Sequence, residues 1–484
     1  MFLELDGQGP RYAQLIRALK AAILDGRMLA GSRLPPTREL ARELELSRTT
    51  VLVAYEQLRA EGFIEGRIGS GSYVASLRAL PARHPPERAV APPTRYALRA
   101  RQVKDPRPAH FHYDKRHNPQ YGNALVNPSL YRIWGRELEH AAANMEWVKA
   151  DPAGLPALRQ QVCDYLGRRR GVLATPEDVL IVSGAHQAFS LTARVLLEEG
   201  DTAVLEEPHY FALRHALSTH GANLLPVHVD DQGLICGELP VAASPRLICV
   251  TPSHQFPTGA VLSLPRRFEL LHYAEQRHCW ILEDDFDGEF RYDGHPLAAL
   301  RSLDQGDRVT YVGSFSKPLS GAVRLGYMVL PAALRRDFIT AKYLDDTACP
   351  DIEQAALAHF MASGGFDRHL RRMHKELKAR RTALVDGLRR HAGDRVEIVD
   401  VPVGMYLLVW LHGYDDARAD TLIARACERG LGLHSLSAHY CEPPPRPGVM
   451  FGYGRLSAAA LDEATRLFAQ CLDEDTATAP ARAT

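Results

Sequence analysis

The stretch YVGSFSKPLSGAVRLGYMVLP, residues 311–331, decides the fold of the larger part of the chain. An apolar segment runs into a turn of small residues, which carries Lys317 and is followed seven residues later by Arg324. Such an apolar run is typical of a strand buried on both faces of a parallel sheet. Ligands of α/β proteins bind at the carboxyl ends of these strands, so the stretch predicts both a fold and a site.

Apolar strands and amphipathic helices alternate on both sides of this stretch. The expected strands are 179–184, 202–207, 246–251, 280–284 and 308–315. The expected helices between them are 185–198, 209–220, 265–277 and 332–342. This alternation predicts an α/β main domain with a mostly parallel sheet. A basic pair of helices near 350–392 is expected to begin a smaller C-terminal α+β part.

The first 75 residues predict a separate winged helix-turn-helix. Apolar residues recur at helical spacing in 12–24, Ser47 is expected to cap a third helix at about 48–61, and two short strands follow. The third helix of such a unit enters the major groove of DNA, and here it opens with polar residues. The alternative, a helical module that binds protein, is weakened by the wing and stays open.

Composition divides the chain into four segments. Residues 76–108 contain seven prolines, eight Lys/Arg and two Asp/Glu without apolar periodicity, which predicts an extended linker after the winged helix at 1–75. The basic linker could contact DNA phosphates or be a solvated tether. The main domain is expected at 109–473, and the polar residues 474–484 are expected to be disordered.

Composition also limits the class of protein. The formal net charge of the 484 residues is zero, so any contact with DNA must be local. The eight cysteines form no CxxC pair and no His/Cys ligand spacing, which favours reduced thiols in a cytosol and no metal site. No run of 18 apolar residues and no signal peptide is present, so we expect a cytoplasmic protein without a membrane partner.

The pairing of Lys317 with Arg324 suits a phosphorylated aldehyde. The lysine amine can form a Schiff base with the carbonyl carbon, and the guanidinium can bind the phosphate through two hydrogen bonds. Pyridoxal 5′-phosphate is such an aldehyde. It also needs a carboxylate at its ring nitrogen, an aromatic ring against its face and backbone donors for its phosphate.

The carboxylate is expected to be Asp284, which ends an apolar strand 33 residues before Lys317. This gap is about one strand-helix-strand step, which places both residues at the same edge of neighbouring strands. Two alternatives stay open at this point. The segment EDDFDGE could bind a divalent metal through Asp284, Asp285 and Asp287, or it could be a solvated turn.

The other two requirements have candidates at the ends of two further strands. Gly184 ends a strand, and the amides of Ala185 and His186 open the next helix toward an anion. Tyr210 follows the strand that ends in Glu206 and Glu207, where a stacking ring could lie. Each signal is weak alone, because such turns are common and a tyrosine is more often part of a core.

Two resemblances bring these signals together. Residues 34–74 resemble the DNA-binding domain of the GntR family of bacterial regulators, which implies DNA contacts by five residues: Arg38, Arg48, Thr49, Thr50 and Gly71. SGAHQA, EEPHY, TPSHQFPTGAVLSLPRR, ILEDDFDGEFRY and SFSKPLSGAVRLGY resemble the fold-type I aminotransferase domain of the MocR subfamily of GntR regulators. The two resemblances cover about residues 1–75 and 109–470.

The second resemblance implies the role of each site residue. Lys317 would form the Schiff base with pyridoxal phosphate, Asp284 would pair with the ring nitrogen, and Tyr210 would stack on the ring. The phosphate would be held by Gly184, Ala185, His186, Ser314 and Arg324. Arg455, in FGYGRLS, falls where the family binds the carboxylate of its effector.

The chain departs from the family pattern at two positions. The subfamily usually has a tyrosine where this chain has Phe286, and aminotransferases place an asparagine where it has Phe256. The phenolic oxygen O3′ of the cofactor would therefore receive fewer hydrogen bonds, unless Ser253, His254 or Gln255 takes over.

Two functions follow from the resemblance. In the first, the chain is a transcription regulator that senses a small amine, amino acid or B6 vitamer by exchange of the Schiff base at Lys317. In the second, it is an active aminotransferase that carries a DNA-binding domain. The winged helix, the linker and the apolar O3′ surroundings favour the first, and the sequence leaves open whether the chain has enzyme activity. The resemblance also implies a homodimer that binds a double-stranded operator with repeated half-sites.

Overall fold

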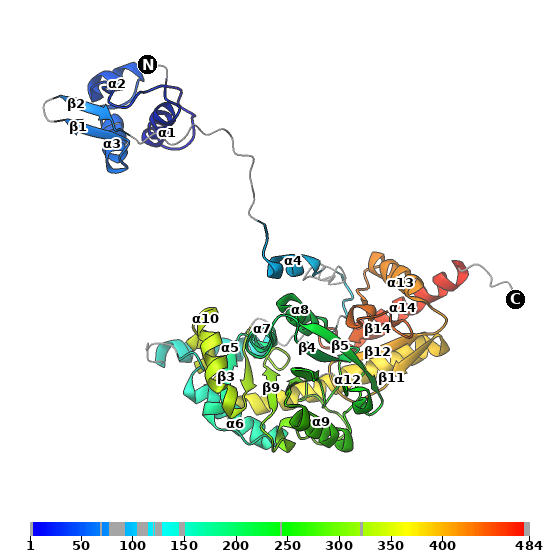
Figure 1. Ribbon diagram of the computed structural model, residues 1–484. Helices are drawn as coiled ribbons and strands as arrows, with labels where there is room; N and C mark the ends of the chain where they lie inside the picture. Colours follow the sequence, from blue (N-terminus) through cyan, green and yellow to red (C-terminus); the bar gives the residue numbers. More distant parts are fainter. Residues whose placement is uncertain are drawn as a thin grey trace. The chain divides into compact units, whose positions relative to one another are not determined.

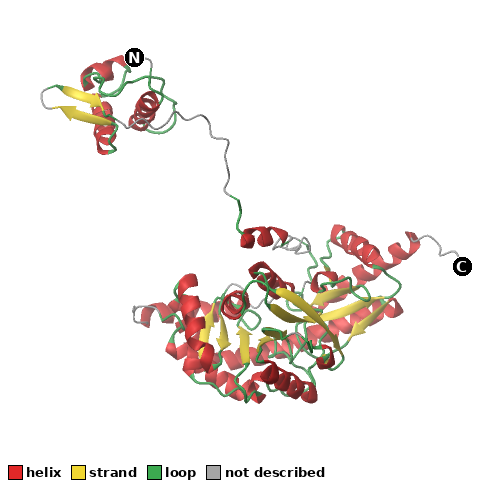
Figure 2. Cartoon of the chain, in the orientation of Figure 1, coloured by secondary structure: helices red, strands yellow, loops and turns green. Residues whose placement is uncertain are grey.

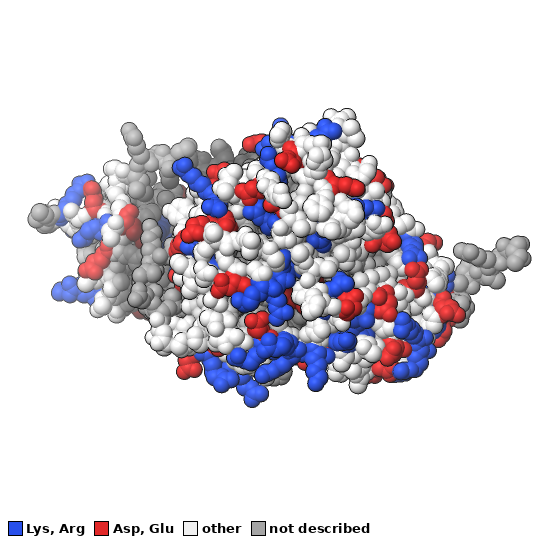
Figure 3. Space-filling view, turned by 90° about the horizontal axis from the view of Figure 1, so that it is seen from below, with Lys and Arg blue, Asp and Glu red and all other residues white. Residues whose placement is uncertain are grey.

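The computed structural model describes residues 3–67, 70–76, 92–103, 115–119, 121, 128–144, 151–242, 244–319 and 323–478. The chain divides into two compact units, Met1–Pro92 and Pro93–Thr484. Within the described ranges, no helix is both long and apolar enough to cross a bilayer. Lys/Arg and Asp/Glu side chains are interspersed on the face shown in Figure 3, in keeping with the formal net charge of zero.

The first unit is a winged helix-turn-helix (Figure 1). Its elements are α1 (Arg11–Leu24), α2 (Thr37–Glu43), α3 (Arg48–Ala60) and the antiparallel ribbon of β1 (Ile64–Arg67) and β2 (Gly71–Val74). The helices enclose a core that includes the fully buried Leu15, Leu40 and Val51. Ser47 caps α3 by accepting a hydrogen bond from the Thr50 amide at 3.0 Å. The predicted fold of this unit is confirmed.

The second unit is built on a central, mostly parallel sheet with helices around it (Figure 2). In spatial order its strands are β3 (Val179–Val182), β10 (Gly326–Val329), β9 (Val309–Ser314), β8 (Trp280–Asp285), β7 (Leu247–Val250), β4 (Thr202–Glu207), β5 (Asn223–Asp230) and β6 (Gly233–Leu234). Neighbouring strands from β9 to β5 are parallel, whereas β10 is antiparallel to both β3 and β9. The predicted α/β class is confirmed, and β5, β6 and β10 are additional to the predicted strands.

The helices of the main domain cover both faces of this sheet. They are α5 (Pro128–Asn144), α6 (Pro156–Arg170), α7 (Ala185–Leu196), α8 (Phe211–His220), α9 (Leu264–Arg277), α10 (Arg335–Asp346) and α11 (Asp351–Ala362). In β3, Val179 and Ile181 pack with α6, while Leu180 and Val182 pack with α7. This alternation explains why the strand reads as a continuous apolar run, because both of its faces are buried.

The C-terminal part forms its own small α+β layer. Long helix α12 (Gly365–His391) leads into the antiparallel sheet of β11 (Val396–Val399), β12 (Tyr406–Leu411), β14 (Gly448–Gly452) and β13 (His434–Ser435). Helices α13 (Asp416–Glu428) and α14 (Ala458–Thr478) complete this part. The predicted basic helix pair corresponds to α11 and α12.

The expectation of an extended linker at 76–108 is wrong for one segment. Helix α4 (Arg95–Gln102) lies within it, and Arg99 holds this helix against α8. The Arg99 guanidinium donates to the carbonyls of Thr219 (2.9 Å) and His220 (3.1 Å), and it pairs with Glu199 at 3.1 Å. The last carbonyls of a helix have no partner within it, so a cation at that end stabilises both helices.

The expectation of a disordered tail at 474–484 is also wrong for its first residues. Helix α14 continues to Thr478 because buried Asp475 pairs with Arg418 (2.6 Å) and Arg425 (3.4 Å). The rest of that prediction, like most of the linker at 77–91 and 104–108, falls outside the described residues.

Replacing Arg99 with alanine should loosen α4. Loss of its charge-assisted hydrogen bonds should reduce the free energy that holds α4 in place by about 1.5 kcal/mol or more. Amide hydrogen exchange in residues 95–102 should therefore accelerate about tenfold. Arg101→Ala on the same helix is the control, since Arg101 is exposed. Equal exchange rates in the two variants would show that Arg99 does not hold the helix.

Candidate cofactor site

Asp284 and Lys317 lie at the same edge of the central sheet. Strands β8 and β9 are parallel neighbours, and Asp284 is in register with Val312. Lys317 stands in the turn just beyond the end of β9. The predicted pairing of these strands is confirmed. Their connection contains only a short 3₁₀ helix, Leu300–Leu303, where the spacing had suggested a full strand-helix-strand step.

Asp284 is a buried carboxyl group with an open hydrogen-bonding position. Only 5% of the residue is exposed, and its Oδ1 has no hydrogen-bond partner among the described residues. Burial raises the pKa of Asp284 to about 8, and the charges of Asp285 and Asp287 add to this rise. The opposing influence comes from Lys317, whose positive charge lowers the pKa of Asp284.

Lys317 is partly buried, and its amine is electrostatically coupled to two carboxyl groups. Burial lowers the pKa of Lys317 from its ordinary 10.5, while Asp287 first and Asp284 second act to raise it. A lysine whose pKa is lowered has a larger fraction of free amine at neutral pH, which is the form that attacks a carbonyl carbon. The ends of neighbouring strands thus supply an amine and a buried carboxyl group at the same edge of the sheet.

The start of α7 offers an anion-binding turn. Gly184 caps the helix with φ +87°, and the amides of Ala185 and His186 donate to no acceptor among the described residues. A Cβ at Gly184 would lie 3.3 Å from Nη2 of Arg324, so the missing side chain lets the guanidinium lie over the turn. Arg324 also donates to the Ser183 carbonyl at 2.7 Å. A helix N-terminus beside a guanidinium matches the chemistry of a phosphate site.

Tyr210 lies against the start of α7. Its hydroxyl is 3.3 Å from Nε2 of His186, and its ring meets the Phe256 ring edge-on at 5.6 Å. Burial raises the pKa of Tyr210 to about 12; the charge of Asp284 also raises it and that of Arg324 lowers it. Its contact with His186 places the tyrosine beside the anion-binding turn.

Ser314 and Arg455 differ in where they lie relative to the sheet edge that carries Lys317. Ser314 ends β9, is half-buried, and accepts a hydrogen bond from the Ser316 amide at 3.2 Å. Arg455 follows β14, is exposed, and makes no hydrogen bond or ion pair with the described residues. The structure thus brings Ser314 to the edge that carries Lys317, while it gives no contact between Arg455 and that cluster.

Phe256 and Phe286 pack against each other, with ring centroids 5.5 Å apart and planes at 89°. Two of the three residues that could replace their missing polar groups are held elsewhere. Ser253 Oγ accepts from Arg170 at 2.6 Å, and the Gln255 amide donates to the Pro208 carbonyl at 2.7 Å. The third, His254, is held by Asp287 at Nδ1 (2.7 Å), and no described residue forms a hydrogen bond with its Nε2.

The segment EDDFDGE is neither a solvated turn nor a shared metal site in the described structure. Its aspartates are buried and each has a different environment. Asp285 pairs with Arg170 at 2.7 Å and accepts a hydrogen bond from Tyr311, while Asp287 pairs with His254 at 2.7 Å. Asp284 differs from both, because its Oδ1 has no hydrogen-bond partner among the described residues.

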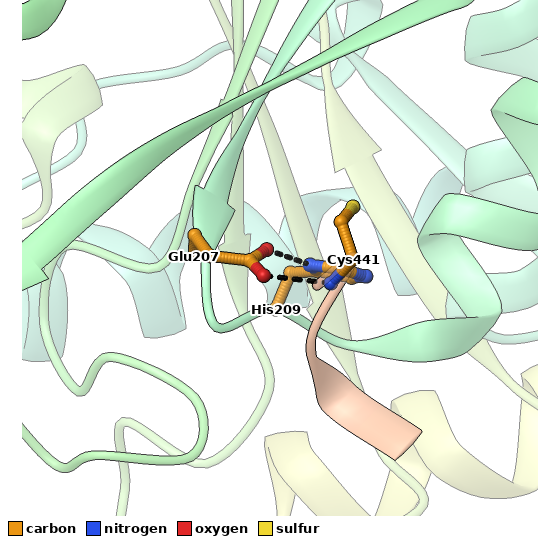
Figure 4. A group of neighbouring side chains, drawn as sticks. All are labelled: Glu207, His209 and Cys441. Atoms are coloured by element: carbon orange, nitrogen blue, oxygen red, sulfur yellow. Dashed lines mark hydrogen bonds and ion pairs between the residues drawn. The ribbon is translucent and has the colours of Figure 1, made fainter. Parts of the chain in front are cut away.

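Glu207, His209 and Cys441 form a contact between the main domain and the C-terminal part (Figure 4). The sequence did not predict this contact. Glu207, at the end of β4, accepts a hydrogen bond from the Cys441 amide at 2.6 Å and lies 3.2 Å from Nδ1 of His209. These three residue types can hold a metal ion. Burial and the charge of Glu207 raise the pKa of the Cys441 thiol, which disfavours the thiolate that a metal needs. We interpret the group as a structural contact that holds the C-terminal part against the main domain.

The five residues expected to contact DNA all belong to the first unit. Arg38 is exposed on α2, and Arg48 and Thr49 are exposed at the start of α3. Thr50 is half-buried, with its hydroxyl 2.7 Å from that of Ser47. Gly71 opens β2 with φ +109°, and a Cβ there would lie 3.3 Å from Nε of Arg33. The start of α3 therefore presents polar groups to solvent, as a DNA-reading helix does.

Comparison with known proteins separates the chain into the same two parts. Residues 11–74 match the family of bacterial regulatory proteins called the gntR family, and residues 123–467 match aminotransferase class I and II. The probable rhizopine catabolism regulatory protein MocR of Rhizobium meliloti is 36% identical over 96% of this chain and 94% of its own. The HTH-type transcriptional regulator TauR of Rhodobacter capsulatus is 35% identical over 80% of this chain and 81% of its own.

Solved structures resemble the second unit. A kynurenine aminotransferase of Pyrococcus horikoshii, in complex with PMP, is 25% identical with a TM-score of 0.68 and covers 74% of this chain and 91% of its own. The α-aminoadipate aminotransferase LysN of Thermus thermophilus, complexed with N-(5′-phosphopyridoxyl)-L-leucine, is 25% identical with a TM-score of 0.66, covering 74% and 94%. Together with the relatives that share both parts, these matches show that the chain belongs to the MocR-type regulators, in which a GntR domain is joined to an aminotransferase class I and II domain.

Proposed function

We propose that the chain regulates transcription by binding pyridoxal 5′-phosphate at Lys317 and exchanging that lysine for the amine of a small effector. The bound cofactor would supply an aldehyde carbon at which one amine can replace another. The observation that carries the proposal is the open Oδ1 of buried Asp284 at the same sheet edge as Lys317. A protonated ring nitrogen would give this oxygen the donor and the positive charge that its surroundings do not provide.

The remaining residues fit the rest of the cofactor. The Gly184 turn, with its open amides and the Arg324 guanidinium, would hold the phosphate, and Ser314 could add a hydroxyl donor. Tyr210, which contacts His186 of this turn, would stack on the ring. Arg455 would bind a carboxylate of the effector, a role that requires the exposed side chain to turn toward the site.

Two observations favour a sensor over an active aminotransferase. The curated relatives that share both parts of the chain are named as regulators. The apolar contact of Phe256 with Phe286 stands where aminotransferases and the subfamily offer polar groups to O3′. The nearly full set of cofactor residues supports the alternative, an active aminotransferase with a DNA-binding domain.

The DNA-binding part of the proposal rests on the first unit. Arg38, Arg48, Thr49, Thr50 and Gly71 would contact a double-stranded operator, with α3 in the major groove. A homodimer would present two such units and would require repeated half-sites. Effector exchange would change DNA affinity only if the effector binds one arrangement of the domains more tightly than another.

The substitution Asp284→Asn should change how the free energy of unfolding depends on pH. The pKa of Asp284 in the folded chain, about 8, exceeds its ordinary 3.8, so the folded state binds the proton more tightly and this group's contribution to stability falls as pH rises between these values. The slope amounts to at most about 1.4 kcal/mol per pH unit. Asp284→Asn should remove it, so the cofactor-free variant should resist urea better than the unchanged protein above about pH 8.

Pyridoxal 5′-phosphate should suppress this difference in the unchanged protein, because its ring nitrogen would pair with the ionised Asp284. The variant should bind the cofactor more weakly. Identical urea midpoints for both cofactor-free proteins across the pH range would contradict the assignment of Asp284.

Titration with amines, followed by visible absorbance, tests the sensor. The cofactor-loaded protein should be yellow, and an effector amine should displace Lys317 and remove the band without yielding a keto acid. Turnover of amino donor and acceptor at about 1–1000 per second would instead establish an aminotransferase. Lys317→Ala should not form the band, whereas Lys375→Ala, which changes an exposed lysine of α12, should retain it.

Arg48→Ala should weaken DNA binding. Loss of a base contact costs about 1–3 kcal/mol, so affinity for sequences selected from a random pool should fall about tenfold or more. Arg27→Ala, which removes an exposed charge outside the recognition helix, is the charge-matched control. If both variants select the same sequences with equal affinity, α3 is not the reading helix.

A further inference from the structure

The exposed face of α3 carries two apolar side chains that the function proposed above does not use. Leu52 is 44% exposed and Val53 is 38% exposed. They lie one turn of helix after Arg48 and Thr49, which are expected to contact DNA. A partner that removes these aliphatic side chains from water gains the free energy of their burial.

The opposite face of α3 is fixed against the core of the first unit. Four of its residues are buried at helical spacing among side chains of α1 and α2: Val51, Ala54, Tyr55 and Leu58. The Tyr55 hydroxyl also donates to the Pro35 carbonyl at 2.9 Å. Because the helix cannot rotate without breaking these contacts, Leu52 and Val53 remain on the outer face, where a partner can reach them.

Leu52 is a neighbour of both residues that open the helix. It follows Arg48 by four positions and Thr49 by three, and residues at these spacings adjoin on a helix surface. Long aliphatic side chains of a helix point toward its N-terminus, so Leu52 covers the turn that carries Arg48 and Thr49. Val53 adjoins Thr49 but not Arg48, and its side chain is shorter. A base pair that Arg48 or Thr49 contacts would therefore lie within reach of Leu52.

The apolar surface is too small for a protein partner. It ends at Arg48 on one side and at exposed Glu56, four residues after Leu52, on the other. A stable protein interface buries about 800 Å² on each partner around an apolar centre, which two side chains between opposite charges do not supply. A small apolar group inside a polar groove fits this surface better.

The major groove of DNA offers such a group. Thymine presents its C5-methyl group there, whereas the other groups on the base edges are hydrogen-bond donors and acceptors that leucine cannot bind. Four residues span about 6 Å along a helix, and base pairs are about 3.4 Å apart. The thymine in contact with Leu52 should therefore lie within about two base pairs of the pair that Arg48 contacts.

We propose that Leu52 contacts the C5-methyl group of a thymine in each operator half-site and thereby selects an A·T pair at that position. Leu52 is then a specificity-determining residue, which adds an apolar contact to the polar contacts expected of Arg48 and Thr49. The inference rests on the DNA-binding part of the function proposed above and extends it to the identity of one base pair.

Deoxyuridine tests this contact, because it differs from thymidine only in lacking the C5-methyl group. The full-length chain first selects an operator from a random pool, and each thymine of that operator is then replaced in turn. For the unchanged protein, one replacement in each half-site should weaken binding about fourfold, the effect of burying one methyl group. Leu52→Ala should bind the thymine and uracil operators with equal affinity.

Two variants serve as controls. Leu29→Ala makes the same substitution at a leucine of the first unit that is 72% exposed and lies outside α3, so the fourfold preference for thymine should remain. Val53→Ala should retain the preference as well. The slope of affinity against salt concentration should be the same in Leu52→Ala as in the unchanged protein, because leucine makes no phosphate contact. A changed slope would show that the substitution displaces the whole helix.

The outcomes separate this inference from the proposed function. If Leu52→Ala keeps the preference for thymine, another residue contacts the methyl group; if it also weakens both operators, Leu52 acts through a contact with protein. Either result overturns the inference, as does an operator without a methyl-dependent thymine within about two base pairs of the position where Arg48→Ala relaxes selection. In these cases the proposed DNA binding stands. If the unchanged protein selects no sequence, the DNA-binding part of the proposed function fails and the inference fails with it.

Discussion

The cost of burying carboxyl groups at the ends of parallel strands governs the arrangement of the main domain. Four acids lie buried along β8 and the turn after it: Glu283, Asp284, Asp285 and Asp287. Glu283 accepts backbone hydrogen bonds from Leu300 and Arg301, Asp285 binds Arg170, and Asp287 binds His254. Among the described residues, one oxygen of Asp284 has no partner. Three of the four acids are thus paired, and in the proposed function the open oxygen of the fourth takes the cationic ring nitrogen of the cofactor.

Features that are set by residues close together in the sequence could be predicted from it. Strand β4 was predicted with its observed bounds, since its apolar residues and its acidic end follow each other in the chain. The spacing of Asp284 and Lys317 gave their shared edge, because parallel strands align their ends. The GntR segment was equally readable, since Ser47 caps α3 through a residue three positions away.

Interactions between residues far apart in the chain could not be predicted. The contact of Glu207 with Cys441 spans 234 residues, and the contact of Arg99 with Thr219 spans 120. The contact of Glu207 with Cys441 corresponds to no recognisable spacing in the sequence. The contact of Arg99 with Thr219 holds a helix in place within a basic segment whose composition predicts a linker. For the same reason the motif TPSHQF drew attention to His254 as a hydrogen-bond donor, although its partner, Asp287, became evident only from the packing of β7 beside β8.

Helix α8 joins the candidate site to the segment that leads toward the DNA-binding unit. It begins directly after Tyr210 and ends under the guanidinium of Arg99 on α4. Ten helical residues span about 15 Å and move as one body. A shift of Tyr210 therefore moves the carbonyls that Arg99 binds, whereas a flexible loop in place of α8 would not transmit the shift. A regulator needs two arrangements that its ligand distinguishes. In the proposed function, α8 therefore offers one rigid connection between the ring of Tyr210 and α4.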